Sequence, residues 1–128
     1  IGAGETELER QLEQLATDYP NRVFCHIGYS ESLAHQLEAG CDIFAMPSRY
    51  EPCGLNQMYS LRYGTPPVVR ATGGLADTVV DLTAHPRKGN GFVFGPPRAE
   101  ALADALCATG AEAAAFAKLY GLQDWLLP

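Results

Sequence analysis

The chain has 128 residues, 15 acidic and 9 basic side chains, and a formal charge of −6. This length fits one domain or part of one, and 47% hydrophobic residues are enough to build a core, which argues against disorder. An acidic balance without a basic cluster argues against a nucleic-acid-binding protein. No apolar run is long enough to span a membrane, and no signal-peptide pattern is visible at the N-terminus, so we expect no membrane partner.

The chain begins with a glycine turn and a predicted helix. Residues 2–4 (GAG) form the kind of turn that normally follows a buried strand, although no strand precedes it in this sequence. Leucines at helical spacing predict a helix over residues 5–18, with glutamates early in the segment, where the helix dipole favours negative charge.

The rest of the sequence alternates short apolar runs with amphipathic segments. The predicted strands are residues 22–27, 42–46, 67–70 and 91–94. The predicted helices are residues 30–40 with Ser30 as N-cap, 54–63, 74–81, 98–108 and 111–119, and residues 85–90 form a polar turn. Strands that are apolar along their whole length suit a parallel sheet with helices on both faces. We therefore predict one α/β domain with a doubly wound, Rossmann-like parallel sheet.

The cysteines and histidines give no sign of a metal centre. Cysteines at positions 25, 41, 53 and 107 lie far apart without a CxxC pair, and we interpret them as reduced. The three histidines have no spacing suited to a metal or a catalytic triad, and no phosphate-binding P-loop or serine nucleophile elbow is present. Metal-dependent, kinase and serine-hydrolase chemistry therefore lose support.

Three junctions should meet at one edge of the predicted sheet. They are residues 28–29, 47–55 and 72–75, each of which follows a predicted strand and leads toward a helix. Ligands of open parallel sheets bind at the carboxyl ends of the strands, so this edge is the expected site.

The middle junction is the strongest candidate. Its loop ends at Gly54, where we place a helix start, and free amides at the positive end of a helix dipole suit a pyrophosphate. Glu51 would repel a phosphate, so we interpret it as an anchor for sugar hydroxyls. The alternative for Glu51 is an exposed loop carboxylate without a function.

The other two junctions are more ambiguous. Gly73 and Gly74 could form a second anion-binding loop, but a glycine pair is more often a tight turn. Tyr29 could stack on a base, although most tyrosines at such positions are half-buried packing residues.

Four motifs occur in a specific order: IGY, PSRYEPCGLNQ, YGTPPVV and TGGLADTV. In this order and spacing they resemble the C-terminal domain of bacterial glycogen synthases and plant starch synthases. The resemblance extends over residues 2–94 and is only loose over residues 95–128. It implies the C-terminal half of a retaining GT-B glucosyltransferase that moves glucose from ADP-glucose to the non-reducing end of an α-1,4-glucan, without a metal or other cofactor.

The resemblance also implies roles for individual residues. Glu51 would hold the hydroxyls of the donor glucose and support an oxocarbenium-like transition state as the catalytic residue. Tyr29 would stack on adenine. The implied donor-binding residues are Gly28, Tyr29, Cys53, Gly54, Leu55, Asn56, Gly73 and Gly74.

Two parts that such a transferase needs are not found in this sequence. One is an Arg/Lys pair that would neutralise the diphosphate and precede residues 2–4, and the other is the N-terminal domain that supplies the glucan groove. We therefore expect residues 1–128 to be the donor-binding part and to be inactive alone. The alternatives are a non-catalytic nucleotide-sugar-binding module and a related retaining transferase with another acceptor. ADP-glucose and UDP-glucose stay open, and the expected compartment is the bacterial cytoplasm, or a plastid for a plant or algal protein.

Overall fold

The computed structural model describes residues 2–119, with side chains described as far as residue 110. It divides into two compact units, residues 1–36 and residues 37–128. The sequence predicts one domain, because it contains no internal linker long enough to separate two. The division falls inside a helix that the sequence predicted as continuous, and each unit is described by itself below.

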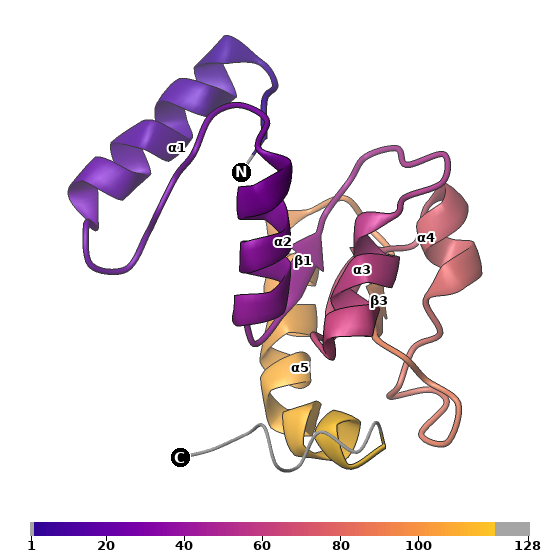
Figure 1. Cartoon of the computed structure of the whole chain (residues 1–128). Helices are drawn as coiled ribbons and strands as arrows, with labels where there is room; N and C mark the ends of the chain where they lie inside the picture. The colour runs from indigo at the N-terminus through magenta and orange to yellow at the C-terminus, as the bar shows by residue number, and fades with distance from the viewer. Residues whose placement is uncertain (1, 120–128) are drawn as a thin grey trace. The chain divides into compact units, whose positions relative to one another are not determined.

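The N-terminal unit contains helix α1 (Thr6–Asp18), labelled in Figure 1, as predicted. Its first turn carries Glu7 and Glu9, so their negative charges face the positive end of the helix dipole. The next helix, α2 (Glu31–Gly40), begins after Ser30, whose Oγ accepts a hydrogen bond from the Leu33 amide at 3.3 Å. The predicted N-cap is therefore confirmed.

The strand predicted over residues 22–27 is wrong. Only Ile27 forms a bridge, in the parallel sense, with Gly2. The Gly2 amide donates to His26 O at 3.2 Å, and the Gly28 amide donates to Gly2 O at 2.7 Å. A strand needs a neighbour along its length, and among the described residues this segment has one pairing residue only, so its β-forming composition does not produce a strand.

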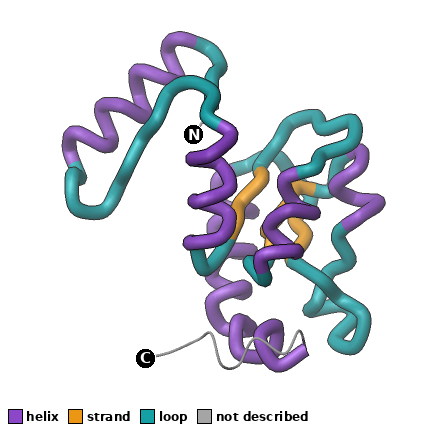
Figure 2. The backbone as a smooth tube through the Cα atoms, in the orientation of Figure 1, coloured by secondary structure: helices purple, strands orange, loops and turns teal. Residues whose placement is uncertain are grey.

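The C-terminal unit contains a three-stranded parallel sheet in the order β1-β2-β3, drawn in orange in Figure 2. The strands are β1 (Phe44–Met46), β2 (Pro67–Arg70) and β3 (Phe92–Phe94). Ala45 is in register with Val68, and Val69 with Val93. The predicted α/β architecture with a parallel sheet is confirmed, although β1 and β3 are shorter than the apolar runs that predicted them.

Three helices pack around this sheet: α3 (Asn56–Tyr63), α4 (Gly73–Thr78) and α5 (Ala99–Leu119). Helix α5 joins the two segments predicted as separate helices. Gly110, between them, lies inside the helix, because a glycine in a helix interior costs only about 1 kcal/mol and does not end it. Helix α4 ends at Thr78, before the predicted end, because Val79 adopts an extended conformation.

The core lies on both faces of the sheet. On one face Val68, Phe92 and Phe94 are buried against α5, in a cluster that also includes Leu82. The partly buried side chains packed against this cluster include Leu61 of α3 and, on α5, Ala101, Leu102, Ala105 and Leu106. On the other face Val69 packs with Leu75 of α4 and with Val79. Helices therefore cover both faces, as a doubly wound sheet requires. No helix within the described residues is long and apolar enough to cross a membrane.

Candidate functional site

The loop of residues 47–55 leaves the carboxyl end of β1 and leads into α3. Arg70, the last residue of β2, holds the beginning of this loop: its Nε donates to Ser48 O at 2.7 Å, and a terminal guanidinium nitrogen donates to Arg49 O. The neighbouring strand therefore fixes the loop through two donor nitrogens of the Arg70 guanidinium, both directed at the protein backbone.

The middle of the loop packs against the start of α4. Glu51 is partly buried, and its carbonyl oxygen accepts a hydrogen bond from the Gly74 amide at 3.1 Å. A Cβ on Gly73 would lie 2.0 Å from Glu51 O, and a Cβ on Gly74 would lie 2.0 Å from Cys53 O. Both positions therefore require glycine because two backbones touch. This packing supports the tight-turn interpretation of the glycine pair over a second anion loop, and the Gly74 amide is already engaged.

The end of the loop differs from the prediction. Gly54 has a φ of +63°, and α3 begins at Asn56, so the helix start predicted at Gly54 is wrong. A residue in the left-handed region cannot continue a right-handed helix, and glycine adopts this conformation without a steric cost. The Leu55 carbonyl accepts the amides of Met58 and Tyr59 at 2.9 and 3.0 Å and so begins the helix.

Two backbone amides at this end of the loop, those of Gly54 and Leu55, are without an acceptor among the described residues. In the part of the chain that the structure describes, neither Gly54 nor Leu55 donates a backbone hydrogen bond. Cys53 and Asn56 are exposed, and the Leu55 side chain is 57% exposed. Residues 53–56 thus present free amides and side chains at the surface, next to Glu51 in the chain.

Gln57 and Arg70 support the loop, and neither residue was predicted to have a role. Gln57 is fully buried, and its Nε2 donates to Gly54 O at 2.9 Å and to Thr78 Oγ1 at 3.0 Å. The signal that could have identified Arg70 is a cation at the carboxyl end of an otherwise apolar strand. For Gln57 the position inside the PSRYEPCGLNQ motif was visible, but its burial was not.

The first predicted junction lies in the N-terminal unit. Gly28 has a φ of +130°, which favours glycine at this position. The Tyr29 side chain is 89% exposed, so it is not a half-buried packing residue.

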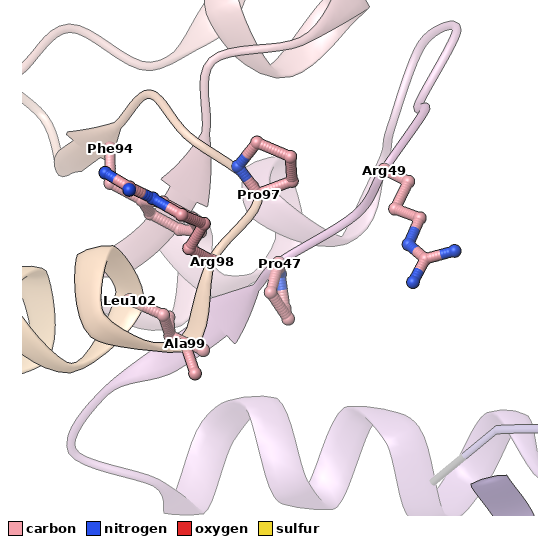
Figure 3. Close-up of a pocket in the computed structure, with 7 residues that line it drawn as sticks. All are labelled: Pro47, Arg49, Phe94, Pro97, Arg98, Ala99 and Leu102. Carbon is pink, nitrogen blue, oxygen red and sulfur yellow. The ribbon is translucent and has the colours of Figure 1, made fainter.

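A shallow cleft of about 170 Å³ lies beside the ends of β1 and β3. Figure 3 shows its lining, which consists of Pro47, Arg49, Phe94, Pro97, Arg98, Ala99 and Leu102. The guanidinium groups of Arg49 and Arg98 point away from each other in this view, so they do not form a joint anion site. Neither Glu51 nor Gly54 lines the cleft, and we therefore place the candidate site on the loop.

The cysteines are free, as predicted: Cys25 and Cys41 are partly buried, and Cys53 and Cys107 are exposed. Burial is the main influence on Cys41 and raises the pKa of its thiol. Among the described residues, no cluster of three or more histidine, cysteine, aspartate or glutamate side chains could hold a metal ion.

Comparison with known proteins shows extensive similarity. Residues 1–108 match the family described as glycosyl transferases group 1. The chain is 65% identical over 103 residues to a glycogen synthase of Alkalilimnicola ehrlichii, covering 80% of this chain and 21% of that protein. It is 61% identical over 106 residues to a glycogen synthase of Halorhodospira halophila, covering 83% of this chain and 22% of that protein. The chain thus spans about a fifth of the length of these relatives.

Two solved structures share the fold. The catalytic domain of starch synthase IV from Arabidopsis thaliana, bound to ADP and acarbose, superposes with a TM-score of 0.76 at 32% identity, over 88% of this chain and 24% of that one. A sucrose-phosphate synthase from Thermosynechococcus elongatus superposes with a TM-score of 0.68 at 27% identity, over 91% of this chain and 30% of that one.

Proposed function

The chain belongs to the glycosyl transferases of group 1, and we propose that it forms the donor-binding part of a glycogen synthase. In this proposal the whole enzyme is a retaining hexosyltransferase that moves glucose from ADP-glucose to the non-reducing end of an α-1,4-glucan. The 65% identity to a glycogen synthase supports this acceptor over the sucrose-phosphate synthase alternative, whose structural relative is 27% identical. A bacterial cytoplasmic location is part of the proposal.

The observation that carries the proposal is the free amide pair at the end of the loop. The amides of Gly54 and Leu55 have no acceptor among the described residues, and they precede the positive end of α3. A helix N-terminus with free amides suits a diphosphate. Cys53 and Asn56 flank the pair and would complete the diphosphate contacts.

Glu51 lies close enough in the chain to meet the sugar that the diphosphate carries. We assign its carboxylate to the glucose hydroxyls and to stabilisation of positive charge at the anomeric carbon. Its partly buried position and its backbone bond to Gly74 support this role, because a carboxylate acts best from a fixed position. Gly73 and Gly74 would then contribute by holding the loop at its closest approach.

The adenine would stack on Tyr29, beside Gly28. The supporting observations are the 89% exposure of the tyrosine side chain and the ADP bound to the starch synthase relative.

The proposed reaction follows from these positions. The bond between the anomeric carbon and the diphosphate oxygen breaks, the acceptor hydroxyl oxygen bonds to the anomeric carbon, and the hydroxyl proton leaves with the diphosphate. The amides of Gly54 and Leu55 take up negative charge that develops on the diphosphate, and Glu51 stabilises the positive charge on the sugar. We assign the glucan groove and the cations for the leaving group to those parts of the relatives that this chain does not span.

A hybrid synthase tests the proposal. In this hybrid, the matching segment of the Alkalilimnicola ehrlichii enzyme is replaced by the segment of this chain that is 65% identical to it. We expect it to transfer radiolabelled glucose from ADP-glucose to glycogen, and not to a hexose phosphate. A hybrid that folds and transfers no glucose from either ADP-glucose or UDP-glucose would contradict the proposal, and transfer to the hexose phosphate alone would favour the sucrose-phosphate synthase alternative.

A further inference from the structure

The side chain of Gln57 is buried beneath the loop and links it to α4. Its exposed fraction is 0%. The amide nitrogen donates to Gly54 O at 2.9 Å and to Thr78 Oγ1 at 3.0 Å, and Cys53 O lies at 3.4 Å. An amide nitrogen carries two hydrogens, so the longest of these three contacts shares a hydrogen with another. Thr78 in turn donates to Gly74 O at 2.6 Å, which extends the link into the first turn of α4.

The amide oxygen of the same side chain is buried. Gln57 Oε1 accepts no hydrogen bond from any residue that the structure describes. It lies 2.6 Å from where a Cβ on Gly54 would be, so it occupies the space that the glycine leaves. A buried acceptor without a donor costs free energy, and an apolar side chain of the same length would avoid that cost. The oxygen therefore contributes nothing that favours a glutamine here, and the contacts of this side chain with the loop and with α4 are made by its N–H groups.

These N–H groups determine which way two peptide groups face. The peptide bonds are trans, so the amide hydrogen of each peptide points opposite to its carbonyl oxygen. The carbonyls of Cys53 and Gly54 are turned toward Gln57. The amides in the same two peptide groups are those of Gly54 and Leu55, and they consequently point away from Gln57. They are also the two amides that have no acceptor within the described residues.

We infer that Gln57 is a positioning residue that holds the amides of Gly54 and Leu55 toward the donor diphosphate. The inference rests on the proposed function, because it needs a diphosphate at this loop. Without the anchor, the two peptide groups rotate, and the donor has to order them on binding. With the anchor, the donors are already oriented before the ligand arrives. Glu51 would touch the donor, whereas Gln57 would act only through the backbone.

The test compares stability with affinity in the full chain. Gln57→Met keeps the length of the side chain and removes both the donors and the unpaired oxygen. The substitution leaves the Gly54 carbonyl without its donor but also removes an unpaired oxygen, so we expect only a small change in the urea midpoint. The affinity for ADP-glucose, measured by calorimetry, should be lower by about tenfold. The matched control is Gln14→Met. Gln14 is exposed on α1, and its Nε2 donates to Asp18 Oδ1 of the same helix at 2.8 Å, so affinity should stay as in the wild type.

Amide chemical shifts provide the readout that a purely structural role would not change. Addition of ADP-glucose to the wild-type chain should shift the Gly54 and Leu55 amide signals downfield, and Gln57→Met should lose most of this shift. If Gln57→Met does not fold, Thr78→Val takes its place in the test, because it removes one acceptor of Gln57. We then expect affinity to fall by about threefold.

The outcomes separate the two proposals. If the wild type binds and Gln57→Met binds equally well, the inference is overturned and the proposed function stands. If the wild type binds neither ADP-glucose nor ADP at millimolar concentration, the donor site itself is contradicted, and the inference falls with it. A loss of affinity that only parallels a loss of stability, in both variants, would also overturn the inference.

Discussion

The amide of Gly74 donates a hydrogen bond to the carbonyl oxygen of Glu51 over 3.1 Å. This bond joins the first turn of α4 to the middle of the loop that follows β1. Arg70 fixes the beginning of the same loop through Ser48 O at 2.7 Å, and Gln57 fixes its end through Gly54 O at 2.9 Å. The proposed catalytic carboxylate therefore lies on a loop that three separate elements hold in place.

Gly74→Ala should weaken this arrangement. The added Cβ would lie 2.0 Å from Cys53 O, and a backbone atom cannot move away as a flexible side chain can. We expect the free energy of unfolding, measured by urea denaturation, to fall by about 2 kcal/mol. Gly110→Ala is the control, since its Cβ would meet no atom within 4 Å. In a helix interior that change should stabilise by about 0.5 kcal/mol. Equal effects of the two substitutions would contradict the close backbone contact.

Glu51→Ala tests the role of the carboxylate in the hybrid synthase. We expect kcat to fall on the order of a hundredfold or more, because the charge that stabilises the sugar in the transition state is lost. The dissociation constant of ADP, which carries no glucose, should change by less than about threefold. Glu100→Ala, an exposed glutamate in the first turn of α5, should leave both quantities unchanged. Equal losses of kcat and ADP affinity for Glu51→Ala would contradict a role on the sugar side.

A predicted strand was correct where the segment has neighbouring strands to pair with, and wrong where it has almost none. Strand β2 was predicted at its observed bounds. Val68 and Val69 are buried on opposite faces of the sheet, and a continuous apolar run in the sequence indicates a strand buried on both faces. Residues 22–27 have a similar composition, but Phe24 is 72% exposed and only Ile27 pairs. Composition reports that a segment can form a strand, and the presence of a neighbour decides whether it does.

The sequence motifs predicted the candidate site, but not the residues that hold its loop in place. The loop and Glu51 could be identified from spacing and from the family resemblance. The supports could not, because the bond between Gly74 and Glu51 and the bond between Gln57 and Thr78 join positions far apart in the sequence. The helix start was misplaced for a related reason: Gly54 was interpreted as part of the helix, whereas its φ of +63° ends the loop.

Cys53 offers a chemical test of the ligand position. Its thiol is exposed beside the two free amides, and Cys107 is exposed on α5. If the diphosphate lies at this loop, ADP-glucose should slow maleimide labelling of Cys53 in the full chain and leave Cys107 unaffected. At a ligand concentration ten times the dissociation constant, labelling should slow by about tenfold, because only free protein reacts. Peptide mapping by mass spectrometry separates the two cysteines, and unchanged labelling of Cys53 would argue against the proposed ligand position.

Asp81 connects the turn that precedes β3 to the sheet. Its Oδ2 accepts the Val93 amide at 2.7 Å, and its Oδ1 accepts the Ala84 amide at 3.0 Å and the Thr83 hydroxyl. Burial is the largest single influence and acts to raise the pKa of this carboxyl. The hydrogen bonds from Thr83, Val93 and Ala84 together outweigh it and hold the pKa below its ordinary value of 3.8.

This lowered pKa predicts how stability changes in acid. Because the folded state prefers the ionised carboxylate, Asp81 stabilises the fold fully above the unfolded-state pKa, and that contribution is lost as the pH falls through the folded-state pKa. Asp81→Asn should lower the free energy of unfolding at pH 7 by about 1 kcal/mol, a modest value because the side chain is partly exposed to solvent. It should also flatten the decline measured by urea denaturation below about pH 4. Asp77→Asn, at an exposed position on α4, is the control. If both variants lose stability in acid as steeply as the wild type, the hydrogen bonds to Asp81 do not favour its charged form.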